Sequence, residues 1–227
     1  MGERAALAAT VGAVSTEAAA ESALERSWWL RAPAVLVAPH AVFVALRDDS
    51  EEATQARQEP VMLIAGLAGI AGVLATSTFR RALNDGSVTM TLVAVLAFIA
   101  GSLYALSFYW VGGGLLYRAS RRLGSEGSWL RSRQVLALAA TPLALSLLTL
   151  WPVRIAVYGT DLFRTGGNDY GTGDAIFGAI NYAFIGWSVL LLLIGVRAVH
   201  GWTTARALAT VALASVLPAL VVLAATV

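Results

Sequence analysis

The sequence predicts an all-α, polytopic membrane protein with a five-helix transmembrane bundle and an N-terminal interfacial helix. Three observations carry this prediction. Of the 227 residues, 58% are hydrophobic and only 13% are charged, whereas a soluble domain carries about 25% charged residues. The mean hydropathy is +0.71. The apolar residues also form long charge-free runs, and each run is long enough to cross the roughly 30 Å hydrocarbon core of a bilayer as a helix.

This composition excludes several classes of protein. So apolar a chain could not cover a water-facing surface, which argues against a soluble enzyme and against a disordered protein. The net charge of +2 is too small to indicate a nucleic-acid partner. The sequence contains no cysteine, so it offers neither a disulfide framework nor a thiolate ligand for a metal.

Five segments are long and apolar enough to be membrane spans. The second is longer than one crossing needs, and we expect its excess to tilt or to protrude as a helix. The fifth continues to the last residue of the sequence. The predicted spans are 61–79, 87–117, 134–153, 175–196 and 207–227.

A further apolar run, residues 32–46, is too short for a typical span. It contains Pro33 and Pro39 and follows Trp28 and Trp29, which suit the headgroup level of a bilayer. We therefore expect it to lie along the membrane surface. The predicted organisation is a cytoplasmic N-terminal segment (1–31), an interfacial helix with an acidic linker (32–59) and a five-span membrane domain (60–227). Within the second part, residues 47–59 read as a solvated connection.

The distribution of arginine predicts the orientation. All sixteen basic residues are Arg, and twelve of them fall in 1–59, 118–133 and 197–206. With five spans these three segments lie on one side of the membrane, and the positive-inside rule makes that side cytoplasmic. We therefore expect a multi-pass protein of the cell membrane with a cytoplasmic N-terminus and an external C-terminus.

Several stretches carry a resemblance to a known family. They are RAPAVLVAPHAVFVAL from residue 31, EPVMLIAGLAGIAGVL from residue 59, YWVGGGLLYRASRRLGSEGSWLRSRQVLALAATPLALSLL from residue 109 and WSVLLLLIGVRAVHGW from residue 187. The chain resembles the Yip family, the Ypt/Rab-interacting membrane proteins, in its prokaryotic branch. The resemblance implies five membrane helices and a membrane-organising or partner-binding role. The family's eukaryotic link to vesicle traffic and small GTPases does not carry over to a prokaryotic member.

Two groups of glycines are candidates for helix packing. Small residues let helices approach closely in lipid, which is where they gain packing energy. We expect contact within the chain for the first group, with a dimer interface as the alternative, and a kink or a close helix approach for the second. The candidates are Gly66, Gly69, Gly72, Gly112, Gly113 and Gly114.

The most polarised feature of the sequence is a basic loop between the second and third spans. We expect Gly124 to end one helix and Ser128 to cap the next, which would bring guanidinium groups together around one turn. The loop is either a topology signal or a docking surface for an acidic partner or a lipid headgroup. The candidate binding residues are Arg118, Arg121, Arg122, Arg131 and Arg133.

The sequence offers no catalytic or metal-binding pattern. The two histidines, His40 and His200, lack an HExxH or carboxylate partner pattern, and we expect no cofactor. Asn181 and Tyr182 are the best polar candidates within a span. We therefore expect a non-enzymatic scaffold or partner-binding protein that contacts membrane lipids and either another membrane protein or a second copy of itself. The alternative is a small transporter or channel component for an uncharged or lipidic solute.

Overall fold

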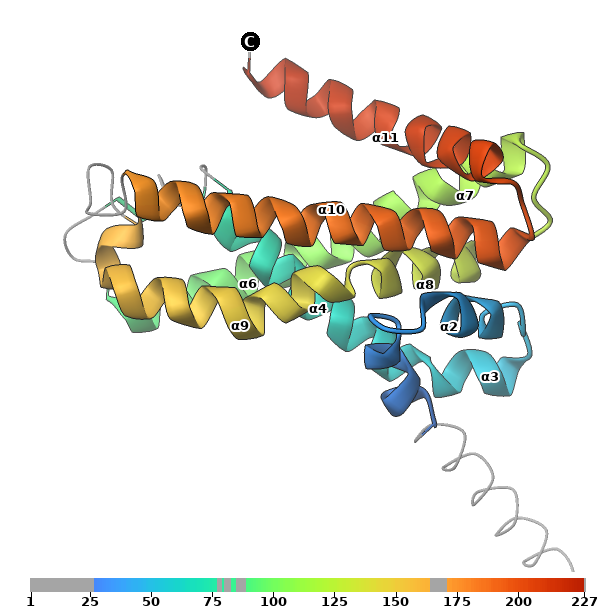
Figure 1. Cartoon of the computed structure of the whole chain (residues 1–227), viewed down its shortest axis with the longest axis horizontal. Coiled ribbons are helices and arrows are strands. Elements are labelled where there is room, and N and C mark those ends of the chain that lie inside the picture. The colour runs from blue at the N-terminus through green and yellow to red at the C-terminus, as the bar shows by residue number, and fades with distance from the viewer. Residues whose placement is uncertain (1–26, 77–78, 80–82, 85–88, 164–170, 227) are drawn as a thin grey trace, which may run out of the picture.

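The computed structural model describes residues 27–226 apart from 77–78, 80–82, 85–88 and 164–170. The regular elements of this part of the chain are helices. The longest of these helices lie side by side in one elongated bundle (Figure 1). Four helical segments are long and apolar enough to cross a membrane, which confirms the predicted class. They are Glu51–Ala75, Met90–Arg122, Trp129–Phe163 and Thr172–His200.

The first long segment consists of α3 (Glu51–Ala56) and α4 (Gln58–Ala75). The hydroxyl of Ser50 accepts a hydrogen bond from the backbone N–H of Ala53 and caps α3. Two acidic residues in the first turn of α3 complement the positive end of its dipole. The helical segment thus begins well before the predicted span at residue 61, within the stretch expected to be a solvated connection.

The second long segment contains α6 (Met90–Ser107), the π-helical turn η1 (Phe108–Gly112) and α7 (Gly113–Arg122). It crosses α4 at two glycines. A Cβ on Gly69 would lie 2.5 Å from the carbonyl oxygen of Gly101, and a Cβ on Gly101 would lie 2.6 Å from the Cα of Ile70. Only glycine permits this approach of two backbones, so the crossing depends on both positions.

The third long segment is divided into α8 (Trp129–Ala139) and α9 (Thr141–Tyr158), followed by the 3₁₀ turn η2 (Gly159–Phe163). Pro142 lies in the first turn of α9, where its missing N–H and fixed φ are tolerated. The break at Ala140 offsets the two helices in Figure 1. Proline therefore interrupts the predicted span near its middle.

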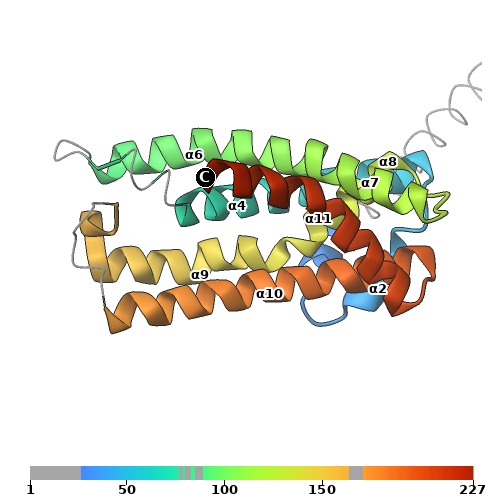
Figure 2. The same ribbon diagram turned by 90° about the horizontal axis from the view of Figure 1, so that it is seen from above.

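The fourth long segment is α10 (Thr172–His200), which ends at Gly201 with a φ of 64°. This left-handed conformation is the usual glycine helix stop. The chain then turns into α11 (Thr204–Thr226), which runs back from the same end of the bundle and diverges from α10 (Figure 1, Figure 2). The stretch of α11 whose side chains are described, Thr204–Leu220, is an apolar helix. The fifth crossing stays a prediction.

The region expected to be one interfacial helix, 32–46, is not a single helix. Residues 27–34 are helical, a turn follows at 35–37, and α2 (Pro39–Ala45) comes after it. Phe43 of α2 is fully buried, and its ring edge lies 2.9 Å from where a Cβ on Gly195 of α10 would be. Seven helical residues span about 10 Å, too little to cross a bilayer. That this pair lies in the lipid interface stays a prediction.

Large apolar side chains cover the outer surface of the long helices. Phe98 and Leu103 of α6 are 64% and 62% exposed, and Ile176 and Leu190 of α10 are 56% and 53% exposed. In water such a surface would drive aggregation, whereas in a bilayer it faces hydrocarbon. The charged side chains of the described residues are concentrated instead at the ends of the bundle.

Candidate functional site

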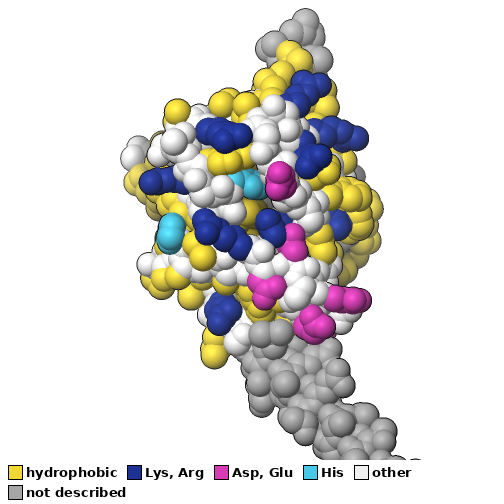
Figure 3. Space-filling view, turned by 90° about the vertical axis from the view of Figure 1, so that its right-hand side faces the viewer, with side chains coloured by type: hydrophobic (Ala, Val, Ile, Leu, Met, Phe, Trp, Pro, Cys, Tyr) yellow, Lys and Arg dark blue, Asp and Glu magenta, His cyan; other side chains and the backbone are white. Residues whose placement is uncertain are grey.

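Arginine gathers at one end of the bundle, where α3 begins, α7 turns into α8 and α10 turns into α11. Figure 3 looks onto this end and shows the basic side chains spread across it, with the acidic ones towards one side. We call it the Arg-rich end. The arginines at this end include Arg47, Arg57, Arg118, Arg121, Arg122, Arg131, Arg133, Arg197 and Arg206.

The turn between α7 and α8 forms as the sequence predicts. Helix α7 continues to Arg122, and Gly124 follows with a φ of 84°. The hydroxyl of Ser128 accepts a hydrogen bond from the backbone N–H of Arg131 and so caps α8. Arg121 donates from Nη1 to the carbonyl oxygen of Ser125 at 3.0 Å, which closes the turn from the α7 side.

The five candidate arginines have different surroundings. Arg118, Arg121 and Arg122 are exposed, whereas Arg131 is half-buried and Arg133 is buried. Among the described residues, none of the three exposed arginines forms an ion pair with a carboxylate. The five predicted binding arginines thus fall into two groups. Arg118, Arg121 and Arg122 are exposed, whereas Arg131 and Arg133 contact other parts of the protein.

Arg131 connects α8 to the acidic linker. Its Nη2 lies 2.5 Å from a carboxylate oxygen of Asp49 and donates to the carbonyl oxygen of Arg47 at 2.8 Å. Within the linker, the backbone N–H of Ser50 donates to Asp48 at 3.0 Å and lowers the pKa of that carboxyl from its ordinary value. The linker is therefore held on the bundle by its polar groups.

Arg133 lies against aromatic rings. Its guanidinium carbon is 4.0 Å from the ring centroid of Trp110, 4.6 Å from that of Trp129 and 5.1 Å from that of Tyr109. Gly113 makes this position possible, because a Cβ there would lie 2.9 Å from the Cα of Arg133. Cation–π contacts of this kind contribute about 0.5–2 kcal/mol each. The buried Nε of Arg133 finds no hydrogen-bond acceptor in the described part of the chain.

Sequence reasoning missed Arg57, the most deeply buried charge of the Arg-rich end. It has no exposed surface. Its Nε donates to Gln134 at 2.6 Å, Nη1 donates to the carbonyl oxygen of Asp48 at 2.7 Å, and Nη2 donates to Thr54 at 3.2 Å. Nη2 also lies 3.5 Å from Asp49. The interpretation of 47–59 as a solvated connection is wrong at this residue, because the linker folds against α8.

Two more arginines connect the α10–α11 turn to the rest of the end. Arg47 donates from Nε and Nη2 to the carbonyl oxygen of Ala198, at 3.0 and 2.5 Å. This carbonyl lies in the last turn of α10, where backbone carbonyls lack a donor within the helix. Arg206 donates to the carbonyl oxygen of Leu123 in the α7–α8 turn. Nδ1 of His200 lies 3.2 Å from the hydroxyl of Ser125. The Arg-rich end is thus one connected polar structure.

The comparisons with known proteins give one decisive match. The sequence model of the Yip1 domain matches residues 15–226. The chain belongs to the Yip1 domain family. Neither a curated protein nor a solved structure matches it.

Family membership confirms the resemblance drawn from the sequence. Yip family proteins are membrane proteins that are not known as enzymes and that interact with other proteins and with membranes. Membership does not favour the transporter or channel alternative.

In this member of the Yip1 domain family, the six candidate glycines are not equivalent. A Cβ on Gly72 would lie 2.9 Å from the ring of Tyr104, and a Cβ on Gly112 would lie 2.9 Å from the side chain of Leu136. Together with Gly69 and Gly113, these two occupy close contacts between helices. Of the described residues, none comes within 4 Å of a Cβ placed on Gly66.

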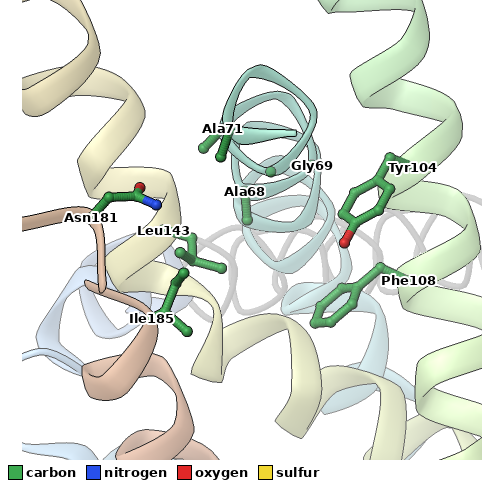
Figure 4. Close-up of a pocket in the computed structure, with 10 residues that line it drawn as sticks. Ala68, Gly69, Ala71, Tyr104, Phe108, Leu143, Asn181 and Ile185 are labelled. Carbon is green, nitrogen blue, oxygen red and sulfur yellow. The ribbon is translucent and has the colours of Figure 1, made fainter. Parts of the chain in front are cut away.

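A cavity of ≈ 270 Å³ opens among α4, α6, α9 and α10 (Figure 4). Tyr104 and Phe108 line one side of it, and Asn181 and Ile185 of α10 line the other. Asn181 is one of the two polar residues that the sequence singled out within a span. No charged side chain lines this cavity, so it lacks the groups that an ion-coupled carrier uses.

Proposed function

We propose that this Yip family protein is a non-enzymatic membrane-organising scaffold whose Arg-rich end holds an acidic protein partner against the membrane. The observation that carries the proposal is the exposed set of arginines at that end. Arg121 and Arg122 project from the end of α7, and Arg197 from the end of α10. Among the described residues, none of these three has a carboxylate partner.

The linker balances only part of the charge of the Arg-rich end. It carries five carboxylates, from Asp48, Asp49, Glu51, Glu52 and Glu59, against the nine arginines named above. Asp49 lies between Arg57 and Arg131, so its carboxylate is already engaged by two cations. The remaining guanidinium groups form a cationic surface, which raises the rate and selectivity of association with an acidic partner. Their forked geometry also suits paired hydrogen bonds with carboxylates. Two copies would repel one another through this end, so the proposed partner is a different protein.

We further propose that the Arg-rich end is cytoplasmic, that the N-terminus shares that side and that the C-terminus lies outside the cell membrane. The asymmetry of the sixteen arginines supports this orientation. The chain has no cysteine, so single cysteines report their side without a background. Glu126→Cys at the α7–α8 turn and Thr172→Cys at the start of α10 are both at exposed positions. A membrane-impermeant maleimide should label only Thr172→Cys in intact cells and both variants in permeabilised cells.

The scaffold is tested by crosslinking in native membranes. A photocrosslinker attached at Glu126→Cys lies beside the exposed arginines. We expect one stoichiometric protein partner, and we expect the double variant Arg121→Gln/Arg122→Gln to lose about tenfold or more of the crosslinked product, because charge-assisted hydrogen bonds are lost. This loss should shrink at high salt, where screening already weakens the contact.

The control for this experiment is Arg118→Gln, which removes one charge from the same helix one turn away. Circular dichroism must show unchanged helicity in all variants. Equal crosslinking in the parent and in Arg121→Gln/Arg122→Gln at low salt, or the absence of any protein adduct, would refute the scaffold proposal.

A further inference from the structure

Beside the turn between α7 and α8 lies a buried cation, Arg133, that has no anionic partner among the described residues. Arg133 is only 9% exposed, and none of the ion pairs among the described residues includes it. Removing a guanidinium from water costs several kcal/mol. The three aromatic rings that surround it offset part of this cost. In the described part of the chain no carboxylate balances the charge of Arg133, so its guanidinium keeps the capacity to bind an external anion.

Two further donors meet beside Arg133, above the bare backbone of Gly114. The indole Nε1 of Trp129 lies 3.7 Å from the point where a Cβ on Gly114 would be, and Nη1 of Arg118 lies 3.9 Å from the same point. Trp129 therefore has the Arg133 guanidinium against its ring and the Arg118 guanidinium near its N–H edge. Because residue 114 is a glycine, the indole N–H and the Arg118 guanidinium both lie close to the backbone of α7 at this point.

The position of these donors indicates the source of the anion. Trp110 and Trp129 are 47% and 44% exposed, and Val111 and Leu106 beside Trp110 are 59% and 46% exposed. The donors thus lie where the apolar surface of α6 and η1 meets the Arg-rich end. Tryptophan favours this boundary between hydrocarbon and headgroups. A soluble anion would use the donors alone, whereas a phospholipid would use the donors and the apolar surface together.

We propose that Arg118, Arg133 and the indole N–H of Trp129 bind the phosphate of one anionic phospholipid from the leaflet at the Arg-rich end. The acyl chains lie along the exposed apolar side chains of α6 and η1. This site is separate from the protein-binding surface proposed above, which uses Arg121, Arg122 and Arg197, and it does not require that surface to have a partner.

The experiment is a lipid titration of the full-length protein in neutral detergent, read by native mass spectrometry. The probes are a short-chain phosphatidylglycerol and the phosphatidylcholine with the same chains. We expect one phosphatidylglycerol per chain in preference to phosphatidylcholine. Arg118→Gln should weaken this binding about tenfold or more, because a charge-assisted hydrogen bond is lost. Arg197→Gln removes the same charge from an exposed position on another helix and should leave the affinity unchanged.

A second pair of variants tests the geometry without changing any charge. Gly114→Ala should retain the lipid, because its methyl group would meet only contacts of 3.7 and 3.9 Å. Gly114→Leu should lose it, because the atoms beyond Cβ would displace the side chains of Arg118 and Trp129. If both Arg118→Gln and Gly114→Leu bind phosphatidylglycerol like the parent, the site does not exist.

Further titrations distinguish an anionic lipid from a free phosphate ion and from a neutral lipid. If inorganic phosphate, or phosphatidylcholine, binds as tightly as phosphatidylglycerol, the proposal of an anionic-lipid site is overturned. Arg121→Gln/Arg122→Gln should keep the bound lipid even though we expect it to lose the protein adduct. Failure of the scaffold and failure of the lipid site therefore appear in different variants and different assays.

Discussion

Two arginines at the Arg-rich end are both buried, yet their surroundings differ. Arg57, where α3 meets α4, donates to Gln134, to Thr54 and to a backbone carbonyl, and lies 3.5 Å from Asp49. Arg133, in α8, faces three aromatic rings, and its Nε has no acceptor in the described part of the chain. The first charge is satisfied within the protein, whereas the second is stabilised only in part.

The difference separates a structural role from a binding role. A buried cation with its own acceptors gains nothing from an external anion, and its removal leaves those acceptors unpaired. A buried cation that has no carboxylate partner retains its capacity to bind an external anion. Burial alone therefore does not identify a binding arginine, and the hydrogen-bond partners decide between the two roles.

The largest expected effect is the loss of Arg57. Arg57→Leu should lower the free energy of unfolding by about 3–5 kcal/mol, because it removes one partner from a buried polar network. The measurement is unfolding in neutral detergent followed by circular dichroism. Arg197→Leu, at an exposed position, should change the same quantity by no more than about 0.5 kcal/mol. Comparable losses in both variants would show that Arg57 does not hold the linker on the bundle.

An intermediate effect is expected where α7 meets α8. Gly113→Ala should destabilise the protein by about 1–3 kcal/mol, because the new methyl group would overlap the backbone of Arg133. Gly114→Ala is the matched control one residue away and should stabilise the helix by up to about 1 kcal/mol. If the two variants melt at the same temperature, the close packing that places Arg133 among the rings is not required.

The smallest effect on stability is expected at Arg133. Arg133→Leu in detergent without anionic lipid should cost about 1 kcal/mol, because the lost cation–π contacts are offset by removing an unpaired buried charge. Added phosphatidylglycerol should raise the Tm of the parent and leave that of Arg133→Leu unchanged, because only the parent gains binding free energy. An equal rise in both proteins would remove the distinction between Arg57 and Arg133.

The local features of the site could be predicted from the sequence. The turn between α7 and α8 depends on Gly124 and Ser128, which act on the few residues beside them. The long apolar runs specify helices because lipid leaves the backbone no other way to satisfy its polar groups. Of the two glycines at the crossing of α4 and α6, Gly69 was predicted from the pattern of small residues in the first span, whereas Gly101 was not. The signal that could have revealed Arg57 is Gln134, a polar residue at the edge of an apolar run that accepts its hydrogen bond.

By itself, the sequence determined a helical membrane protein of the Yip family with a basic end. Which arginines are buried, paired or free was decided only by the tertiary structure. Arg57 and Gln134 are 77 residues apart in the chain, and Arg131 and Asp49 are 82 apart, so no local pattern relates them. The physical reason is that helix formation depends on neighbouring residues, whereas the state of a charge depends on which acceptors the packed helices bring within hydrogen-bond distance.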